Sequence, residues 1–185
     1  SDLNFLGPGY KVIGSFGHIT HLSNLKQIDF QNNYKPNFNI IESKQNQINK
    51  IQKAIYGAKE IILATDDDRE GEAIAWHICN TFKLPITTTK RIIFNEITKN
   101  ALIKAIANPT VIDIKKVHSQ LGRQVLDQIV GFTISPILWK QFFQGGNKNG
   151  GLSAGRCQTP ALRLIYENYQ EIKDDKGEKV FETIG

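Results

Sequence analysis

Residues 61–74 read IILATDDDREGEAI, and this stretch carries the strongest signal in the chain. Four apolar residues and a threonine at 61–65 predict a short buried strand. Five carboxylates then fall within seven positions, with an apolar helical pattern directly behind them; they are Asp66, Asp67, Asp68, Glu70 and Glu72. Carboxylates packed this closely repel one another unless a positive charge lies between them. A hard divalent cation with oxygen ligands is the usual answer, so the stretch predicts a strand, a metal site and a helix.

The first candidate metal ligands are Asp66 and Asp68. Residues two apart in an extended segment face the same side, so both carboxylates can converge on one Mg²⁺ at the strand's carboxyl end. Magnesium needs only one or two protein carboxylates besides substrate phosphates. We expect Asp67 to point the other way, and Glu70, at the turn into the helix, to reach the ion or a bound water. The alternative is acidic N-capping of the helix, but five acids exceed what one helical turn can use.

Strands and helices alternate over the first part of the chain. We expect strands at 10–16, 61–65 and 91–94, and mostly loop at 20–43. We expect helices over 48–55, over 74–82, and from the N-cap Thr98 to just before Pro109. This alternation is typical of an α/β layer with parallel strands.

The pattern becomes helical after Pro109. One apolar stripe runs over 114–129 and predicts a helix that ends near Gly131, and another predicts a helix over 160–172. A glycine-rich segment at 145–151, expected to be flexible or exposed, separates them. We therefore predict an α/β domain at 1–109 and part of a helical domain at 110–185.

Composition narrows the class of protein. Lys and Arg total 23 against 18 for Asp and Glu, a net charge of +5, which suits a polyanionic partner such as nucleic acid. The two cysteines, Cys79 and Cys157, lie far apart, so no zinc site or disulfide framework is expected. No apolar run approaches the roughly 20 residues of a membrane span. We expect an intracellular protein without a membrane partner, and we interpret both ends as cuts through a larger protein, since the chain has no Met.

Four further residues are open to two interpretations each. Gly17 permits a tight turn that would project His18, although a lone histidine is more often structural than catalytic. Arg69 either neutralises its acidic neighbours or grips a phosphate oxygen. Arg123 and Asp127, four apart on the long helix, form either an ordinary surface pair or an arginine held toward a phosphate by the aspartate.

Hydrogen-bond donors gather at 152–160, before the last helix. Ser153, Arg156, Gln158 and Thr159 all donate, and Pro160 fits the first turn of a helix. A helix N-terminus preceded by donors and an arginine can bind a phosphate. An elaborate capping loop is the alternative, but it would not need Arg156.

Five segments resemble, in order along the chain, motifs of the type IA DNA topoisomerases. They are YKVIGSFGHI at 10–19, ATDDDREGEAIAWH at 64–77, RIIFNEITK at 91–99, QIVGF at 128–132 and LSAGRCQTPALRL at 152–164. FNEIT at 94–98 and SPILWK at 135–140 are closer to the topoisomerase I branch. The match covers nearly the whole chain. It implies a Toprim fold, a Rossmann-like parallel sheet with helices, followed by an α-helical segment of a second, strand-binding domain.

The resemblance also implies roles for single residues. Asp66 and Asp68 match the metal-binding aspartates, Glu70 the third acid of that motif, Arg69 an arginine near the scissile phosphate, and His18 a histidine at the cleavage site. Arg123 and Asp127 match helix residues that contact DNA upstream of the cut. Ser153, Arg156 and Gln158 match the loop that grips single-stranded DNA.

By resemblance, the parent enzyme is a Mg²⁺-dependent monomer that relaxes negatively supercoiled DNA. A tyrosine cleaves one strand and forms a 5′-phosphotyrosine link, the other strand passes, and the 3′-hydroxyl reseals the nick. The family's first strand, with a catalytic glutamate, and its nucleophilic tyrosine are expected outside these residues, so the piece alone should not cleave DNA. Two alternatives stay open: another Toprim enzyme, such as a nuclease or primase, and a non-catalytic module that binds single-stranded DNA.

Overall fold

The structure is a computed structural model that describes residues 6–7, 9–94, 96–142, 152–175 and 177. It divides into two compact units, Ser1–Leu126 and Asp127–Gly185, which we call the first and second unit. The first is mixed α/β and the second is helical in its described part, as the sequence predicts. The glycine-rich segment at 145–151 lies outside the described residues.

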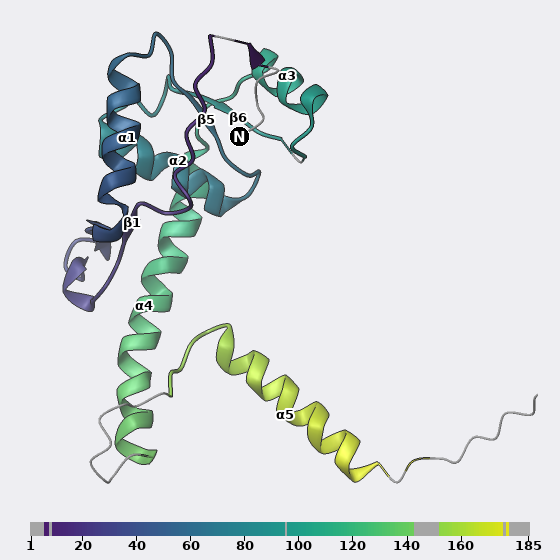
Figure 1. Ribbon diagram of the computed structural model, residues 1–185. Coiled ribbons are helices and arrows are strands. Elements are labelled where there is room, and N and C mark those ends of the chain that lie inside the picture. Colours follow the sequence, from purple (N-terminus) through teal and green to yellow (C-terminus); the bar gives the residue numbers. More distant parts are fainter. Residues whose placement is uncertain (1–5, 8, 95, 143–151, 176, 178–185) are drawn as a thin grey trace, which may run out of the picture. The chain divides into compact units, whose positions relative to one another are not determined.

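A pair of parallel strands forms the centre of the first unit. Strand β5 (Ile62–Ala64) pairs with β6 (Lys90–Ile92), in a register that sets Leu63 opposite Arg91. Helix α2 (Arg69–Phe82) connects the two strands, and α3 (Lys99–Ala107) follows β6 (Figure 1). The Thr98 hydroxyl accepts a hydrogen bond from the Ala101 amide at 3.3 Å, which confirms the predicted N-cap. The β-α-β-α order expected from the sequence is therefore present.

The part of the chain before β5 departs from the prediction. Residues 10–16 form no strand, and the first described strand is β1 (Thr20–His21), antiparallel to β4 (Asn39–Ile40). A second short antiparallel pair joins β2 (Ile28–Asp29) to β3 (Lys35–Pro36), so 20–43 is not only loop. Two 3-10 turns, η2 (Leu25–Gln27) and η3 (Glu42–Lys44), lie in the same stretch. Helix α1 (Gln45–Tyr56) covers the predicted 48–55.

A compact apolar core holds β5, α2 and the start of α4 together. Its buried members are Leu63, Ala75, Cys79, Ile112, Val117 and Leu121. Partly buried side chains around it include Trp76 of α2 and Phe38, which lies between β3 and β4. This packing fixes the end of β5 and the first turns of α2, from which the acidic residues project.

The long helix is longer than the sequence pattern predicts. Helix α4 runs over Ile114–Phe142 and passes through both Gly131 and Pro136, so the predicted end near Gly131 is wrong (Figure 1). Gly131 does not adopt the left-handed conformation with which a glycine ordinarily ends a helix, so the helix continues through it. Helix α5 (Gln158–Asp174) follows, with Pro160 in its first turn as expected. None of the helices in the described ranges could cross a membrane.

Candidate functional site

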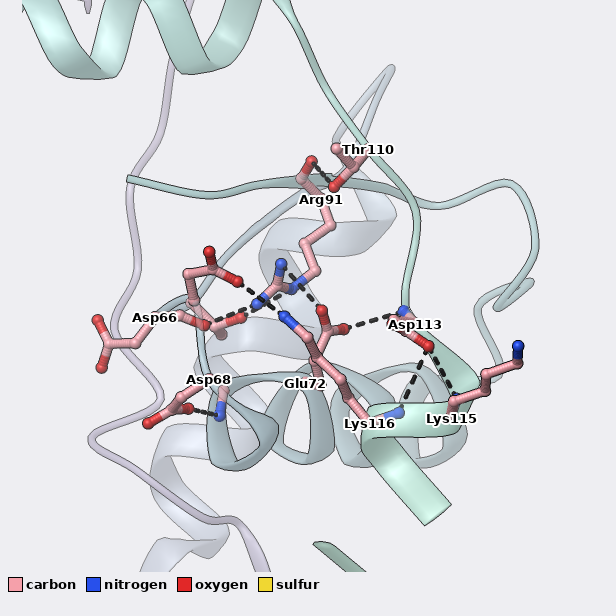
Figure 2. Close-up of polar contacts among 11 residues, drawn as sticks. Asp66, Asp68, Glu72, Arg91, Thr110, Asp113, Lys115 and Lys116 are labelled. Carbon is pink, nitrogen blue, oxygen red and sulfur yellow. Dashed lines mark hydrogen bonds and ion pairs between the residues drawn. The ribbon is translucent and has the colours of Figure 1, made fainter. Parts of the chain in front are cut away.

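The acidic residues form a loop between β5 and α2, which we call the acidic loop (residues 66–68). Asp68 is the N-cap of α2, and its carboxylate accepts a hydrogen bond of 2.6 Å from the Gly71 amide. Figure 2 shows the side chains of Asp66 and Asp68 on the same side of the loop, away from Glu72. Among the described residues, no hydrogen bond or ion pair occupies the Asp66 carboxylate. The capping interpretation therefore accounts for one aspartate oxygen and leaves the rest of this oxygen set accessible.

Gly71 lets the acidic loop fold back onto the first turn of α2. A Cβ at this position would collide with the Asp66 carbonyl oxygen and crowd the Asp66 amide. Gly71 is also buried, so the surrounding atoms leave little room to relax. The glycine in the sequence DREGE is thus required by a close backbone approach that sets the position of Asp66.

A buried arginine in strand β6 contacts the acidic loop from inside the fold. Arg91 of β6 has no exposed surface, and its guanidinium lies 3.2 Å from the carboxylate of Glu72, which is 2% exposed. The same guanidinium donates to the Asp66 carbonyl oxygen at 2.7 Å and to the Thr65 hydroxyl at 3.2 Å (Figure 2). Arg91 therefore neutralises one acid of the run and holds the two residues after β5, Thr65 by its side chain and Asp66 by its backbone.

The start of α4 is attached to α2 by one contact and to the acidic loop by another. The second oxygen of Glu72 accepts from the Asp113 amide at 3.1 Å, and Lys116 donates to Asp67 at 3.0 Å (Figure 2). The hydrogen bond to Asp67, followed by the charge of that carboxylate, raises the pKa of Lys116 above its ordinary value. Asp67 thus engages α4 while Asp66 and Asp68 face elsewhere, as its sequence position predicts.

His18 lies beside the acidic loop. Its Nε2 is 3.3 Å from a carboxylate oxygen of Glu70 in the first turn of α2, and Arg69 is exposed at the first position of that helix. His77 of α2 is 3% exposed. The centroid of its ring lies 6.1 Å from that of the His18 ring and 4.4 Å from that of the Phe38 ring. Burial, and then the nearby His18, lower the pKa of His77 from 6.5 to about 4. His77 is therefore a neutral packing residue, whereas the His18 side chain is 27% exposed.

The donor set of the acidic loop fits a magnesium ion held from one side. Asp66 and Asp68 offer hard carboxylate oxygens on the same side of the loop. Within the described ranges, no three histidine, cysteine or carboxylate side chains converge to enclose a metal ion. An open site with one or two carboxylates suits Mg²⁺, which keeps several waters, better than it suits Zn²⁺ or Ca²⁺.

The strand-binding candidates of the second unit are held by one another. Arg156 lies 3.1 Å from Asp127, and the Gln158 amide donates to the Ser153 hydroxyl at 2.9 Å. Backbone contacts fix the same loop, since the Ala154 amide donates to Ser135 at 3.0 Å. Arg123 belongs to the first unit, where it is partly buried on α4. Among the five candidates, the structure brings together Arg156 with Asp127 and Gln158 with Ser153.

Sequence reasoning missed four residues that shape the site: Arg91, His77, Lys116 and Asp113. Arg91 carries a readable signal, because an arginine inside the apolar strand RIIF needs a buried acid, and Glu72 is the unassigned acid of the run. Lys116 and Asp113 carry no comparable signal, since their contacts join positions more than forty residues apart.

Comparison with known proteins gives two family matches and a structural relative. The Toprim domain family matches residues 3–97, and a DNA topoisomerase family matches residues 111–184. The structure of full-length topoisomerase I from Thermotoga maritima is similar to this chain, with 39% sequence identity and a TM-score of 0.78. The similarity covers 93% of this chain and 28% of that relative, so the chain spans less than a third of the relative's length.

Proposed function

Because the chain belongs to the type IA DNA topoisomerases, as an N-terminal fragment with a Toprim domain, we propose that it supplies the magnesium site and a single-strand-binding surface of an enzyme that relaxes negatively supercoiled DNA. The observation that carries the proposal is the acidic loop. Its Asp66 and Asp68 face one side, and the His18–Glu70 pair lies on the adjoining turn of α2. Two exposed carboxylates next to a partly exposed histidine suit a phosphodiester substrate.

The proposed metal ligands are Asp66 and Asp68, with Glu70 in direct or water-mediated reach. When bound, Mg²⁺ would neutralise charge on the DNA phosphate and support religation. Glu70 also accepts from His18, and this contact holds the imidazole at the edge of the site. Arg69 would then contact the scissile phosphate through its guanidinium. His18 would reach the same phosphate through Nε2–H by exchanging Glu70 for it, since its Nδ1 is buried.

The proposed strand-binding residues act as a preformed set. Asp127 keeps the guanidinium of Arg156 in one place, and Gln158 and Ser153 order each other at the start of α5. Because these side chains are already fixed, binding a DNA backbone restricts their conformational entropy less. Arg123 would add a further phosphate contact from α4.

The chain spans only part of its relative, so the complete reaction is itself a proposal. We propose that the nucleophilic tyrosine lies outside these 185 residues and that the chain alone does not cleave DNA. Strand cleavage through a 5′-phosphotyrosine link, strand passage and religation belong to the longer enzyme. We expect the chain to be monomeric and to act with DNA inside the cell.

Fluorescence anisotropy tests the proposal with a labelled single-stranded oligonucleotide and a duplex of the same sequence, each with Mg²⁺ or with EDTA. We expect single-strand binding that exceeds duplex binding, and no strand cleavage on a denaturing gel. Equal affinity for both DNAs would contradict a single-strand surface, and cleaved product would contradict the placement of the tyrosine.

A further inference from the structure

Phe16 has an unusual backbone and an unusual exposure for its type. Its φ of 54° lies in the left-handed region, which bulky side chains seldom adopt, and the next residue, Gly17, has a φ of 86°. The Phe16 side chain is 75% exposed, far from the burial that a phenylalanine ordinarily finds. A strained conformation that exposes an aromatic ring persists only where the surroundings impose it.

Two side chains at the start of α1 hold Phe16 in this conformation. Lys44 donates to the Phe16 carbonyl oxygen at 2.6 Å, and Gln47 donates to the Gly14 carbonyl oxygen. The Lys44 ammonium also lies over the phenyl ring, 5.9 Å from its centroid. One edge of the ring rests on Gly14, where a built Cβ would lie 3.6 Å from ring carbon Cε1. The ring is therefore held in a defined place, with a cation over it and most of its surface in solvent.

The ring is also close to the candidate site. Phe16 and His18 are two residues apart, so their Cα atoms lie within about 7 Å of each other. His18 in turn contacts Glu70 in the first turn of α2. A base next to a phosphate held at His18 could therefore reach the Phe16 ring, because the two residues are so close along the chain.

We propose that Phe16 is a base-stacking residue, on which a nucleobase of single-stranded DNA next to the His18-bound phosphate lies. A fixed, exposed aromatic ring beside a lysine is a recurring element of single-strand binding sites. The ring can stack on any base, and the lysine attracts the negatively charged phosphates between the bases. Lys44 would meet the backbone phosphate while Phe16 holds the base. The inference rests on the proposed function and adds a base contact to its phosphate contacts.

The test compares two strands that differ only in their bases. Fluorescence anisotropy measures the affinity of the 185-residue chain for a short labelled oligodeoxythymidine and for an abasic oligonucleotide of equal length. Wild type should prefer the thymidine strand, and Phe16→Leu should reduce that preference about tenfold, with unchanged affinity for the abasic strand. Phe16→Trp should restore the preference, since tryptophan offers a larger π-face. Because stacking neutralises no phosphate, Phe16→Leu should leave the salt dependence of binding unchanged.

The matched control is Tyr56→Leu, which removes another exposed ring, 85% accessible, from the far end of α1. It should bind both strands as wild type does. If Phe16→Leu binds the thymidine strand as tightly as wild type, or weakens both strands equally, base stacking is excluded while the proposed function stands. If wild type binds neither strand, both the inference and the proposed function fail.

Discussion

Arg91 and Glu72 form an ion pair of 3.2 Å in a part of the first unit that solvent does not reach. Each partner also makes a contact that the other does not: Arg91 holds the Asp66 carbonyl oxygen, and Glu72 holds the Asp113 amide. The pair therefore connects four segments, namely β6, α2, the acidic loop and the residue before α4. Glu72, the acid of the run to which the sequence assigns no role, therefore supports the acidic loop from inside the fold.

Removing one partner should destabilise the fold strongly. We expect Glu72→Ala to lower the free energy of unfolding by about 3–5 kcal/mol, because it leaves a buried guanidinium unpaired. Urea denaturation followed by circular dichroism measures this. Glu60→Ala is the control, since Glu60 pairs with Lys90 at 2.6 Å on the surface and should change stability by no more than about 1 kcal/mol. Equal effects of the two variants would contradict a supporting role for the buried pair.

Two glycines in helices should respond to alanine with opposite signs. Gly71→Ala places a methyl group against the Asp66 carbonyl oxygen and should cost about 1–3 kcal/mol. Gly122 lies in α4, is exposed, and has no atom within 4 Å of an added Cβ. Gly122→Ala should therefore stabilise the chain by about 0.5–1 kcal/mol, since alanine favours the helix. Thermal unfolding of the two variants checks both signs, and a stable Gly71→Ala would mean that the loop can move.

Lowering the pH should reduce the free energy of unfolding, because His77 is buried in its neutral form. Above pH 6.5 the ring is neutral in the folded and the unfolded chain, because its pKa of 6.5 falls to about 4 on folding. Between pH 6.5 and about 4, His77 binds a proton in the unfolded chain but not in the folded chain. The contribution of His77 to the free energy of unfolding, which is complete above pH 6.5, is therefore lost as the pH falls to about 4. The shift corresponds to about 3 kcal/mol. Unfolding free energies across this range should depend less on pH in His77→Phe than in wild type. His118→Gln, at an exposed position, should keep the wild-type dependence.

The sequence predicts those features of the site that depend on local spacing. Asp66 and Asp68 share a side of the acidic loop, as their spacing predicts, although the loop bends at 67 and 68. Thr98 caps α3 because its hydroxyl reaches the Ala101 amide. The prediction fails where distant contacts decide. Residues 10–16 look like a strand, but the carbonyl oxygens of Gly14 and Phe16 accept from side chains of α1 and its preceding turn. The sequence pattern also does not predict where α4 ends, because the helix continues through both Gly131 and Pro136.

Magnesium binding should depend on Asp66 and Asp68 and not on Asp67. We expect isothermal titration calorimetry with MgCl₂ to show weak binding to wild type and none to the double variant Asp66→Asn with Asp68→Asn. Asparagine at 68 keeps the N-cap, so the loss would reflect charge and not helix fraying. Asp67→Asn should retain binding, because Asp67 is paired with Lys116. Unchanged heats in the double variant would contradict the proposed ligands.

If Arg123 and Arg156 contact DNA phosphates, the affinity for DNA should depend less on salt concentration when both are removed. Replacing Arg123 and Arg156 together by alanine should weaken binding of a single-stranded oligonucleotide. It should also reduce the slope of log K against log salt by about 0.7 for each phosphate that the protein no longer neutralises. Anisotropy titrations at several salt concentrations measure both quantities. Lys90→Ala, which removes a lysine paired with Glu60, should leave the slope near that of wild type. An unchanged slope in the double variant would remove these residues from the proposed surface.

Helix α4 changes character along its length although it is one element. Near its start Val117 is fully buried, whereas Phe132, Ile137 and Phe142 are all substantially exposed. Pro136 has no amide hydrogen, so the Phe132 carbonyl oxygen lacks its usual helical donor. Amide protons of this single helix should therefore exchange with solvent at very different rates. Exchange should be slow around Val117, where release requires opening of the core, and fast beyond Pro136, where fraying of the end is enough.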